Sequence, residues 1–355
     1  MSGPLRILMM GASYGSLLAS KLLLAGHTVK LVCLPAEADL INAEGFHVRF
    51  PIRGRDGLLD VESRRLPGSL SAGGPLGVDP ARFDLVGLAM QEPQYRSPDV
   101  RELLGAVAEA KVPCLSIMNM PPLAFLRRIT SLDADALREC YTDATVWDRF
   151  DPARMTLCSP DPQAFRPPDE KVNVLQVGLP TNFKAARFAS DADNAILRRL
   201  EADIDAARFT TGDGAVELPV KLRVHESVYV PLAKWCMLMT GNYRCIQADA
   251  IHSIRDTVLG DVDRSRSIYD WVAALCVSLG ASPDDLVPFE KYANAAASLG
   301  KPSSVARAVA AGAKHVERVD RLVQLAAKQK GRRSDTLDEI VAIVDRRLDA
   351  NRSAH

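Results

Sequence analysis

A glycine turn near the start of the chain is the first feature whose residue types could do chemistry. Residues 7–32 read ILMMGASYGSLLASKLLLAGHTVKLV, which predicts a strand, a turn, a helix and a second strand. In such a βαβ unit, glycines let the N–H groups at the start of the helix approach a pyrophosphate. We therefore expect the turn to bind a dinucleotide through Gly11, Ser13, Tyr14, Gly15 and Ser16.

The spacing of this turn departs from the usual three-glycine pattern. Ser13 takes the second glycine position, and Gly15 comes one residue earlier than the usual third glycine. A turn that packs tightly and binds nothing is the alternative. Leu34 follows the second strand, where an acid would hold a ribose hydroxyl or an arginine a 2′-phosphate, so these residues leave NAD and NADP open.

Two further polar side chains stand in apolar surroundings. Lys234 lies in VPLAKWCMLM, where a partly buried amine would be suited to donating a proton. Asn119 ends the apolar run VPCLSIMN, which places it at the carboxyl edge of a sheet, where open α/β folds bind ligands. A solvated lysine and a turn-forming asparagine are the alternatives. The sequence shows no His/Cys cluster for a metal and no G-x-S-x-G nucleophile motif.

The elements that must position these residues begin with an open parallel sheet. Short apolar runs at 83–90 and 112–119 flank a predicted helix at 100–110, an alternation typical of buried parallel strands. We also predict strands at 144–147, 155–158 and 172–177, two strands within 46–61, a loop at 67–80, and a helix at 189–206 before a strand near Phe209. This part, residues 1–212, is predicted to be a Rossmann-like dinucleotide-binding domain.

The remainder of the chain has helical periodicity. Apolar residues recur at helical spacing over 224–243, 246–258, 264–279, 284–297, 303–329 and 336–349. We predict an all-helical domain over residues 213–355 that binds substrate and forms a dimer. The fold class is therefore α/β followed by an all-helical domain.

Composition narrows the class of protein. The chain has 355 residues, with 44 Lys plus Arg and 44 Asp plus Glu. Its formal net charge is therefore zero, which gives no overall attraction to nucleic acid or anionic lipid. The seven cysteines are odd in number and lack C-x-x-C spacing, which favours reduced thiols in the cytoplasm. The apolar run at 5–24 is interrupted by small and polar residues and ends near Lys21, so we expect no membrane span. The predicted partner is a small-molecule substrate.

The order of these segments resembles the ketopantoate reductase family. Its members pair an N-terminal Rossmann domain with a helical domain of the 6-phosphogluconate dehydrogenase C-terminal type, and they reduce a 2-oxo acid with NADPH. The segment VKLRVHESVYVPLAKWCMLMTGN (220–242) is similar to the family's catalytic-lysine helix, and SLGKPSSVARAVAAG (298–312) to its substrate-binding segment. SIMNM (116–120) is similar to the strand end that carries the family's asparagine.

The resemblance implies a role for each matching residue. Lys234 matches the catalytic lysine, Asn242 an asparagine eight residues later, and Asn119 the asparagine between cofactor and substrate. Ser304, or else Ser303, matches the serine that binds the substrate carboxylate. On a regular helix, Lys234 and Asn242 would lie about two turns apart and face one cleft.

One further substrate residue depends on the register of the match. The family's acidic residue falls on Val316, so Glu317 qualifies only if the register slips by one residue, which on a helix means about 100° of rotation.

Several positions depart from the family. Gln94 matches a glutamine near the cofactor, and Gln91 replaces a lysine in the same loop; we expect both glutamines to bind the cofactor. Leu34 replaces the family's 2′-phosphate arginine, and Leu238 replaces its first asparagine after the lysine. The spacing of the glycine turn is closer to that of the opine dehydrogenases, which join an amino acid to a 2-oxo acid.

We predict an NAD(P)H-dependent reductase of a 2-oxo acid or related carbonyl, with Lys234 as proton donor and NADP favoured over NAD by the resemblance. The protein is expected to be a cytoplasmic homodimer. Opine-like reductive amination and a non-catalytic dinucleotide-binding sensor are the alternatives.

Overall fold

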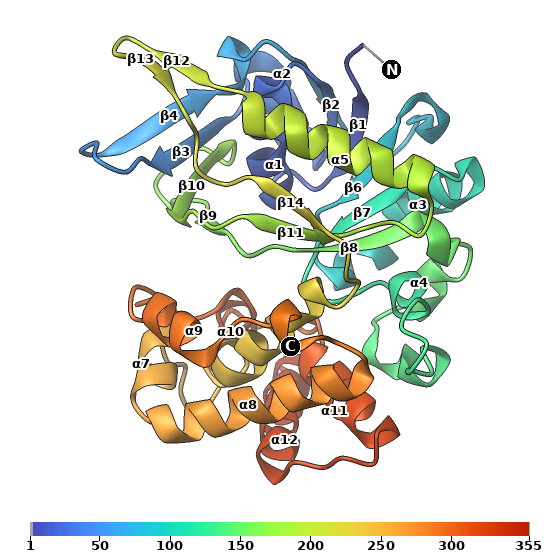
Figure 1. Cartoon of the computed structure of the whole chain (residues 1–355), viewed down its shortest axis with the longest axis vertical. Coiled ribbons are helices and arrows are strands. Elements are labelled where there is room, and N and C mark those ends of the chain that lie inside the picture. Colours follow the sequence, from blue (N-terminus) through green and yellow to red (C-terminus); the bar gives the residue numbers. More distant parts are fainter. Residues whose placement is uncertain (1–2, 355) are drawn as a thin grey trace. The chain divides into compact units, whose positions relative to one another are not determined.

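The computed structural model describes residues 3–354 and divides them into two compact units (Figure 1). The first, here called the sheet unit, comprises residues 3–90, 94–125 and 145–226. The second, the helical unit, comprises residues 91–93, 126–144 and 227–354. Two short pieces of the N-terminal half are therefore built into the helical unit.

An eight-stranded sheet forms the centre of the sheet unit, in the order β14-β11-β8-β7-β6-β1-β2-β5. Its neighbouring strands are parallel except for the antiparallel pair of β8 and β11. The strands are β1 (Arg6–Met10), β2 (Thr28–Val32), β5 (Ser69–Gly73), β6 (Leu85–Leu88), β7 (Cys114–Ile117), β8 (Met155–Ser159), β11 (Phe183–Ala186) and β14 (Leu222–His225). The strand order reverses between β1 and β6, and open α/β folds bind ligands at such a reversal.

Helices and a second sheet cover the central sheet. The helices are α1 (Tyr14–Leu24), α2 (Pro35–Glu44), α3 (Pro98–Ala110) and α5 (Asp191–Ala206), and a short helix α4 (Leu123–Leu126) follows β7. A four-stranded sheet has the order β4-β3-β10-β9, with β3 (His47–Pro51), β4 (Leu58–Glu62), β9 (Gln163–Phe165) and β10 (Val174–Leu179). A separate hairpin pairs β12 (Phe209–Thr211) with β13 (Gly214–Val216).

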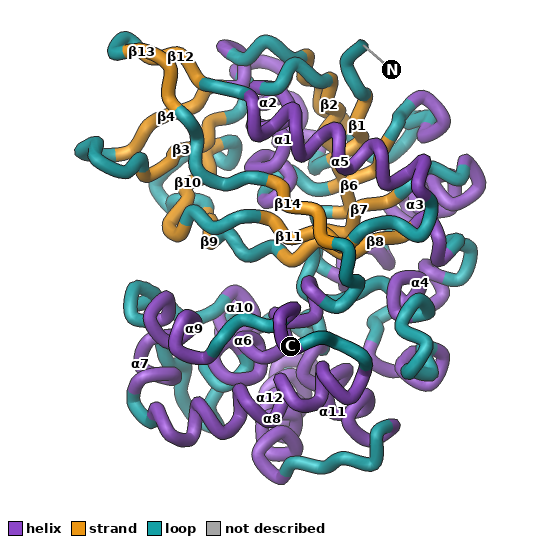
Figure 2. The backbone as a smooth tube through the Cα atoms, in the orientation of Figure 1, coloured by secondary structure: helices purple, strands orange, loops and turns teal. Residues whose placement is uncertain are grey.

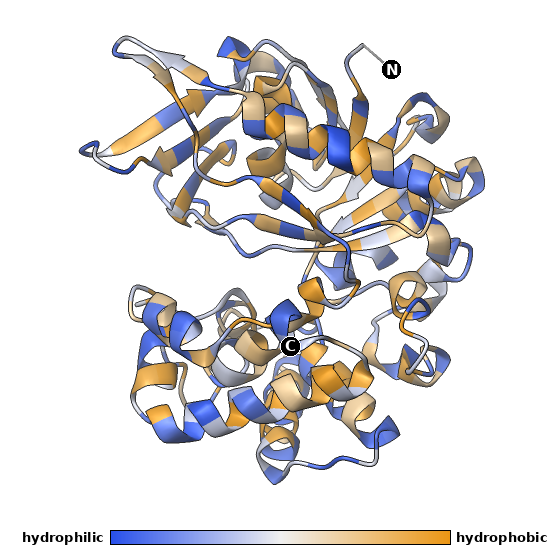
Figure 3. Ribbon diagram, viewed as in Figure 1, coloured by the Kyte–Doolittle hydropathy of each residue, from blue (hydrophilic) through white to orange (hydrophobic). Residues whose placement is uncertain are grey.

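One hydrophobic cluster joins α1, both sheets and α5. It includes Leu17 on α1, Val48 on β3 and Ile204 on α5, each at most 1% exposed. Because apolar layers contact α1 on several sides, nearly the whole of this helix is buried. Helix α5 is instead amphipathic, and Figure 3 shows hydrophilic and hydrophobic residues alternating along it.

The helical unit contains helices joined by loops, as the colouring of Figure 2 shows. Its helices are α6 (Lys234–Met237), α7 (Ile254–Leu259), α8 (Val262–Leu279), α9 (Phe289–Ala296), α10 (Ser304–Ala310), α11 (Val319–Gln329) and α12 (Asp335–Ser353). A 3-10 turn at Val230–Ala233 precedes α6, and a π-helical turn at Leu238–Asn242 follows it. None of the helices in residues 3–354 combines the length and apolar character that a membrane crossing requires.

The predicted fold class is confirmed, but several predicted elements are wrong. Residues 69–73 are predicted as part of a loop, because SLSAG lacks the bulky apolar pattern of a strand. They form β5, because their backbone pairs in parallel with β2. The strand predicted at 144–147 is a 3-10 helix. The helix predicted at 303–329 is two helices separated by residues 311–318, and the sheet extends through β14, beyond residue 212.

Candidate functional site

The turn between β1 and α1 requires glycine at Gly11. Its φ of +106° is rarely adopted by other residues, and a Cβ there would lie 2.6 Å from the carbonyl oxygen of Ala89. Ala89 directly follows β6, so this close approach occurs where the strand order of the sheet reverses. The predicted first glycine therefore lies at the reversal of strand order, which is the position where this class of sheet binds ligands.

Gly15 brings α1 close to the sheet. A Cβ at Gly15 would lie 2.7 Å from Cγ of Met9 on β1. This is the packing role of the third glycine in a dinucleotide-binding turn, performed here one residue earlier in the sequence. The short turn is thus compatible with the βαβ geometry that the sequence predicted.

The other predicted turn residues have distinct environments. Ser13 occupies the N-cap of α1 without a side-chain capping bond, whereas the Ser16 hydroxyl donates to the Ala12 carbonyl at 2.5 Å. The Tyr14 hydroxyl donates to the carbonyl of Pro162 at 3.0 Å. Because the first N–H groups of a helix have no intrahelical acceptor, this end of α1 can bind an anion.

Asn119 lies just beyond β7, which neighbours β6 in the sheet. Its Oδ1 atom is buried and has no hydrogen-bond partner among residues 3–354. Such an orphaned acceptor at the carboxyl edge of the sheet fits a ligand that carries a donor group. Together with the turn at Gly11, it gives the sheet unit two features that a bound dinucleotide would use.

In the helical unit, Lys234 is the first residue of α6 and is 9% exposed. The π-helical turn after α6 is marked by a hydrogen bond of 2.9 Å from the N–H of Tyr243 to the carbonyl of Leu238, five residues earlier. The predicted regular α-helical spacing from Lys234 to Asn242 is therefore wrong. Short π-helical turns are frequent at functional sites.

Outside donors stabilise this π-helical turn. The Tyr292 hydroxyl donates to the Met237 carbonyl at 3.2 Å, and the Arg244 guanidinium donates to the Thr240 carbonyl at 3.0 Å. Tyr292 can reach the turn only because residue 241 is glycine, since a Cβ there would lie 2.1 Å from the tyrosine hydroxyl. Burial lowers the pKa of Arg244, which also donates to the hydroxyl of Ser265.

The end of this turn contacts the predicted substrate segment. The Ser303 hydroxyl donates to the Asn242 carbonyl at 2.7 Å and accepts the N–H of Ala306, which makes Ser303 the N-cap of α10. Ser303 is buried, whereas Ser304 is exposed. Of the two candidate serines, Ser304 is thus the one whose hydroxyl is not used as the helix cap.

Glu317 meets the same turn through the neighbouring residue. The Tyr243 hydroxyl donates to the Glu317 carbonyl and accepts the N–H of Val319. Burial raises the pKa of Tyr243, so the hydroxyl stays protonated and able to donate. Residues 311–318 are not helical, so the expected 100° rotation between Val316 and Glu317 does not apply, and both are buried.

The loop after β6 reaches Glu317 through a residue that sequence reasoning missed. The N–H of Glu92 donates to Oε1 of Glu317 at 3.3 Å, and the Glu92 carboxylate accepts both the N–H and the hydroxyl of Thr142 at 2.9 Å. Gln91, the predicted cofactor residue, is exposed beside it in the helical unit. Gln94 is exposed in the sheet unit, where its carbonyl accepts the Ser97 hydroxyl at 3.0 Å.

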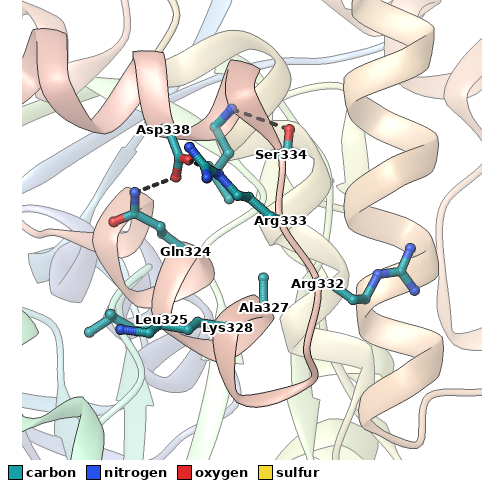
Figure 4. A pocket seen from close by; sticks show the side chains of 9 residues that line it. Gln324, Leu325, Ala327, Lys328, Arg332, Arg333, Ser334 and Asp338 are labelled. Carbon is teal, nitrogen blue, oxygen red and sulfur yellow. Dashed lines mark hydrogen bonds and ion pairs between the residues drawn. The ribbon is translucent and has the colours of Figure 1, made fainter.

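In residues 3–354 no group of His, Cys, Asp or Glu side chains is arranged to hold a metal ion. A pocket of about 370 Å³ lies between the end of α11 and the start of α12 (Figure 4). None of the predicted site residues lines it; its walls are Gln324, Leu325, Ala327, Lys328, Arg332, Arg333, Ser334, Leu337 and Asp338.

Comparison with known proteins gives matches in structure rather than in sequence. No family profile and no curated protein matches the sequence. A probable 2-dehydropantoate 2-reductase from Bacillus subtilis matches with a TM-score of 0.61 and 15% identity over 97% of this chain and 100% of its own. D-mandelate dehydrogenase, in a ternary structure with NADH and anilino(oxo)acetate, matches with a TM-score of 0.63 and 14% identity over 98% of this chain and 99% of its own.

A dimeric ketopantoate reductase from Staphylococcus aureus matches with a TM-score of 0.61 and 9% identity, over 98% of this chain and 100% of its own. These matches cover the α/β part and the helical part alike. The resemblance drawn from the sequence is thereby confirmed for the fold. This chain has the fold of the ketopantoate reductases.

Proposed function

We propose that this protein is an NAD(P)H-dependent reductase of a 2-oxo acid or a related carbonyl compound. The observation that carries the proposal is the convergence of three segments within the helical unit. The turn that follows the Lys234 helix binds Ser303 through the Asn242 carbonyl and binds the Glu317 backbone through Tyr243. A direct hydrogen bond thus links Asn242 to Ser303, the alternative to Ser304 as the substrate serine. Glu317, which matches the family's acidic residue only with a one-residue slip in register, joins the same turn through Tyr243.

The sheet unit would hold the cofactor. The N–H groups at the start of α1 would bind the pyrophosphate beside Gly11, and the buried Asn119 amide would accept a hydrogen bond at the carboxyl edge of the sheet. When bound, a reduced nicotinamide supplies the hydride. We propose NADPH rather than NADH as the cofactor, and NADH, the ligand of the D-mandelate dehydrogenase structure, is the comparison ligand.

The helical unit would hold and protonate the substrate. Negative charge develops on the carbonyl oxygen as its carbon is reduced, and the Lys234 ammonium would donate a proton there. Ser304 and Asn242 offer hydrogen-bonding groups to a carboxylate. Glu317, a buried acceptor, would receive a hydrogen bond from a hydroxyl or amine of the substrate.

The experiment is NADPH oxidation measured against a panel of 2-oxo acids, for the natural protein and for Lys234→Ala. Removal of a proton donor is expected to lower turnover by about 100- to 10,000-fold while NADPH binding is retained. Lys291→Ala, which removes an exposed lysine of α9, is the matched control and should leave turnover unchanged. Equal turnover of Lys234→Ala and the natural protein would remove Lys234 from the reaction.

Two arms of the same experiment separate the alternatives. Repeating the panel with added amino acids tests reductive amination. NADPH oxidation that occurs only when an amino acid is present would support an opine-type reaction and reject simple ketone reduction. Tight NADPH binding without oxidation of any substrate would favour a dinucleotide sensor.

We also propose that the protein forms a homodimer, as the dimeric Staphylococcus aureus reductase does. Light scattering during size-exclusion chromatography tests this, because it measures the mass of the particle in solution.

A further inference from the structure

The segment of residues 160–166, which comprises the loop after β8, strand β9 and Arg166, forms hydrogen bonds at two places that matter for a dinucleotide. Near its start, the Pro162 carbonyl accepts the hydroxyl of Tyr14, which lies in the glycine turn. At its end, Arg166 follows β9 and donates to Oε1 of Glu37, in the first turn of α2. Within the sheet unit, one short segment therefore runs from the turn after β1 to the helix after β2.

These two ends correspond to two parts of a dinucleotide site. In folds of this class the pyrophosphate lies at the turn after the first strand, and the adenosine ribose lies after the second strand. Arg166 contacts the first turn of the helix that follows the second strand, which is the ribose end of such a site. At the expected position for a residue that reads this group, the chain has Leu34, which is 74% exposed and has no polar atom in its side chain.

The Arg166–Glu37 pair has the features of an arginine held in place for an anion. The Glu37 side chain is 10% exposed and the Arg166 side chain 32% exposed. Burial raises the pKa of the Glu37 carboxyl, and the Arg166 guanidinium opposes that rise. A guanidinium carries five N–H donors, and among residues 3–354 Glu37 is the one acceptor found for Arg166. The pair therefore holds the guanidinium in place while the arginine side chain stays partly exposed.

We propose that Arg166 binds the 2′-phosphate of NADP(H), and that Glu37 is the positioning residue that holds its guanidinium beside the end of β2. This inference rests on the proposed function for the identity of the cofactor. It assigns the discrimination between NADPH and NADH to a residue more than a hundred positions away from the second strand. In this proposal, Arg166 takes the role of the arginine that the family carries at the position of Leu34, although it comes from a different part of the chain.

The expected size of the effect follows from the chemistry of the contact. Hydrogen bonds between charged groups contribute about 1.5–3 kcal/mol, and arginine pairs with phosphate in two parallel bonds. The natural protein should therefore bind NADPH about 10- to 100-fold more tightly than NADH. Arg166→Met keeps the length of the side chain and removes its charge, so the ratio should fall to about one, with NADH affinity retained.

The test is calorimetric titration of the full chain with NADPH and with NADH, without substrate, so that no turnover enters the result. Arg64→Met is the matched control, because Arg64 donates to the Asn42 and Ala43 carbonyls at the opposite end of α2. It should leave the ratio unchanged. A second variant, Leu34→Arg combined with Arg166→Met, should restore preference for NADPH by returning a guanidinium to the end of β2.

Each outcome decides the inference. A preference for NADPH that is lost in Arg166→Met and regained in the double variant supports it. Equal affinities in the natural protein, or a preference for NADH, would overturn it while leaving the proposed reductase intact. A parallel loss of both ligands in Arg166→Met would also overturn it, because the arginine would then be structural. Binding of neither ligand by the natural protein would overturn the inference and the proposed function together.

Discussion

Lys21 gives the prediction whose magnitude the structure defines best. This lysine lies on α1 in the sheet unit, is 1% exposed, and donates through Nζ to the Leu218 carbonyl at 3.1 Å. Burial lowers its pKa from 10.5 to about 7, assisted by the positive charge of Lys221 and opposed by Glu217. The perturbation is Lys21→Met, which keeps the apolar stem and removes the amine.

The sign of the pH dependence follows from proton binding. Between pH 7 and 10.5 the unfolded chain holds more protons on Lys21 than the folded chain, so the free energy of unfolding rises with pH through this window. Below pH 7 the cost of burying the charge is fully present. At about 1.4 kcal/mol for each pH unit, the difference between 10.5 and about 7 corresponds to about 5 kcal/mol.

Lys21→Met removes this dependence. It also leaves the Leu218 carbonyl without its donor, which costs about 1–3 kcal/mol at every pH. The stability of the variant relative to the natural protein should therefore be highest near pH 6 and fall by about 5 kcal/mol as the pH approaches 10.5.

Urea unfolding followed by circular dichroism at intervals from pH 6 to 10 measures this difference. Lys171→Met is the control, since Lys171 is 62% exposed in its side chain and pairs with Glu44 on the surface. Its stability relative to the natural protein should change little over the same range. A difference in the free energy of unfolding between Lys21→Met and the natural protein that did not change with pH would refute the reasoning. It would show that burial does not lower the pKa of Lys21.

Two further predictions concern the turn after Lys234. Gly241→Ala places a Cβ 2.1 Å from the Tyr292 hydroxyl and should destabilise the protein by about 1–3 kcal/mol in denaturant unfolding. The cost should be smaller in a Tyr292→Phe background. Gly300→Ala, where the Cβ would make only ordinary contacts, is the control and should be nearly neutral. An equal cost in both backgrounds would show that the clash is not with the hydroxyl. Ser303→Ala should cost about 1 kcal/mol of stability by removing the α10 cap, whereas Ser304→Ala should leave stability unchanged and raise KM; the reverse pattern would exchange the two roles.

The opening unit could be predicted from sequence because its signals are local. The apolar run before Gly11, the helix periodicity and the second strand occur in one continuous stretch, and β1, α1 and β2 form there. Glycine at positions 11 and 15 indicated close backbone approach, and the structure supplies the neighbours, Ala89 and Met9. Only the tertiary structure could identify those neighbours.

Elements that depend on distant partners could not be predicted. Strand β5 has the small residues SLSAG, which resemble a loop, and exists because β2 offers it a full register of parallel pairing. Residues 144–147 have strand-like composition yet form a 3-10 helix in which Trp147 is buried and packs against Tyr95. Lys21, expected to end an apolar run as a charge, is one of the most buried residues of its helix.

The candidate site divides in the same way. Lys234, Asn242, Ser304 and Glu317 could be named from a resemblance, because their segments keep a recognisable order. Tyr243, which joins Glu317 to the turn, and Glu92, which meets it from another part of the chain, have no sequence signal of their own. Long-range hydrogen bonds of this kind arise from tertiary packing and leave no local pattern.

The central claim is hydride transfer to a 2-oxo acid, and isotope transfer tests it most directly. The natural protein would be incubated with NADPH carrying deuterium at both C4 positions of the nicotinamide and with the 2-oxo acids of the panel, and the products analysed by NMR. We predict a 2-hydroxy acid with deuterium on C2, formed by the natural protein and the Lys291→Ala control and nearly absent with Lys234→Ala. Bound NADPH that retains all its deuterium, with no labelled hydroxy acid from any substrate, would contradict the account.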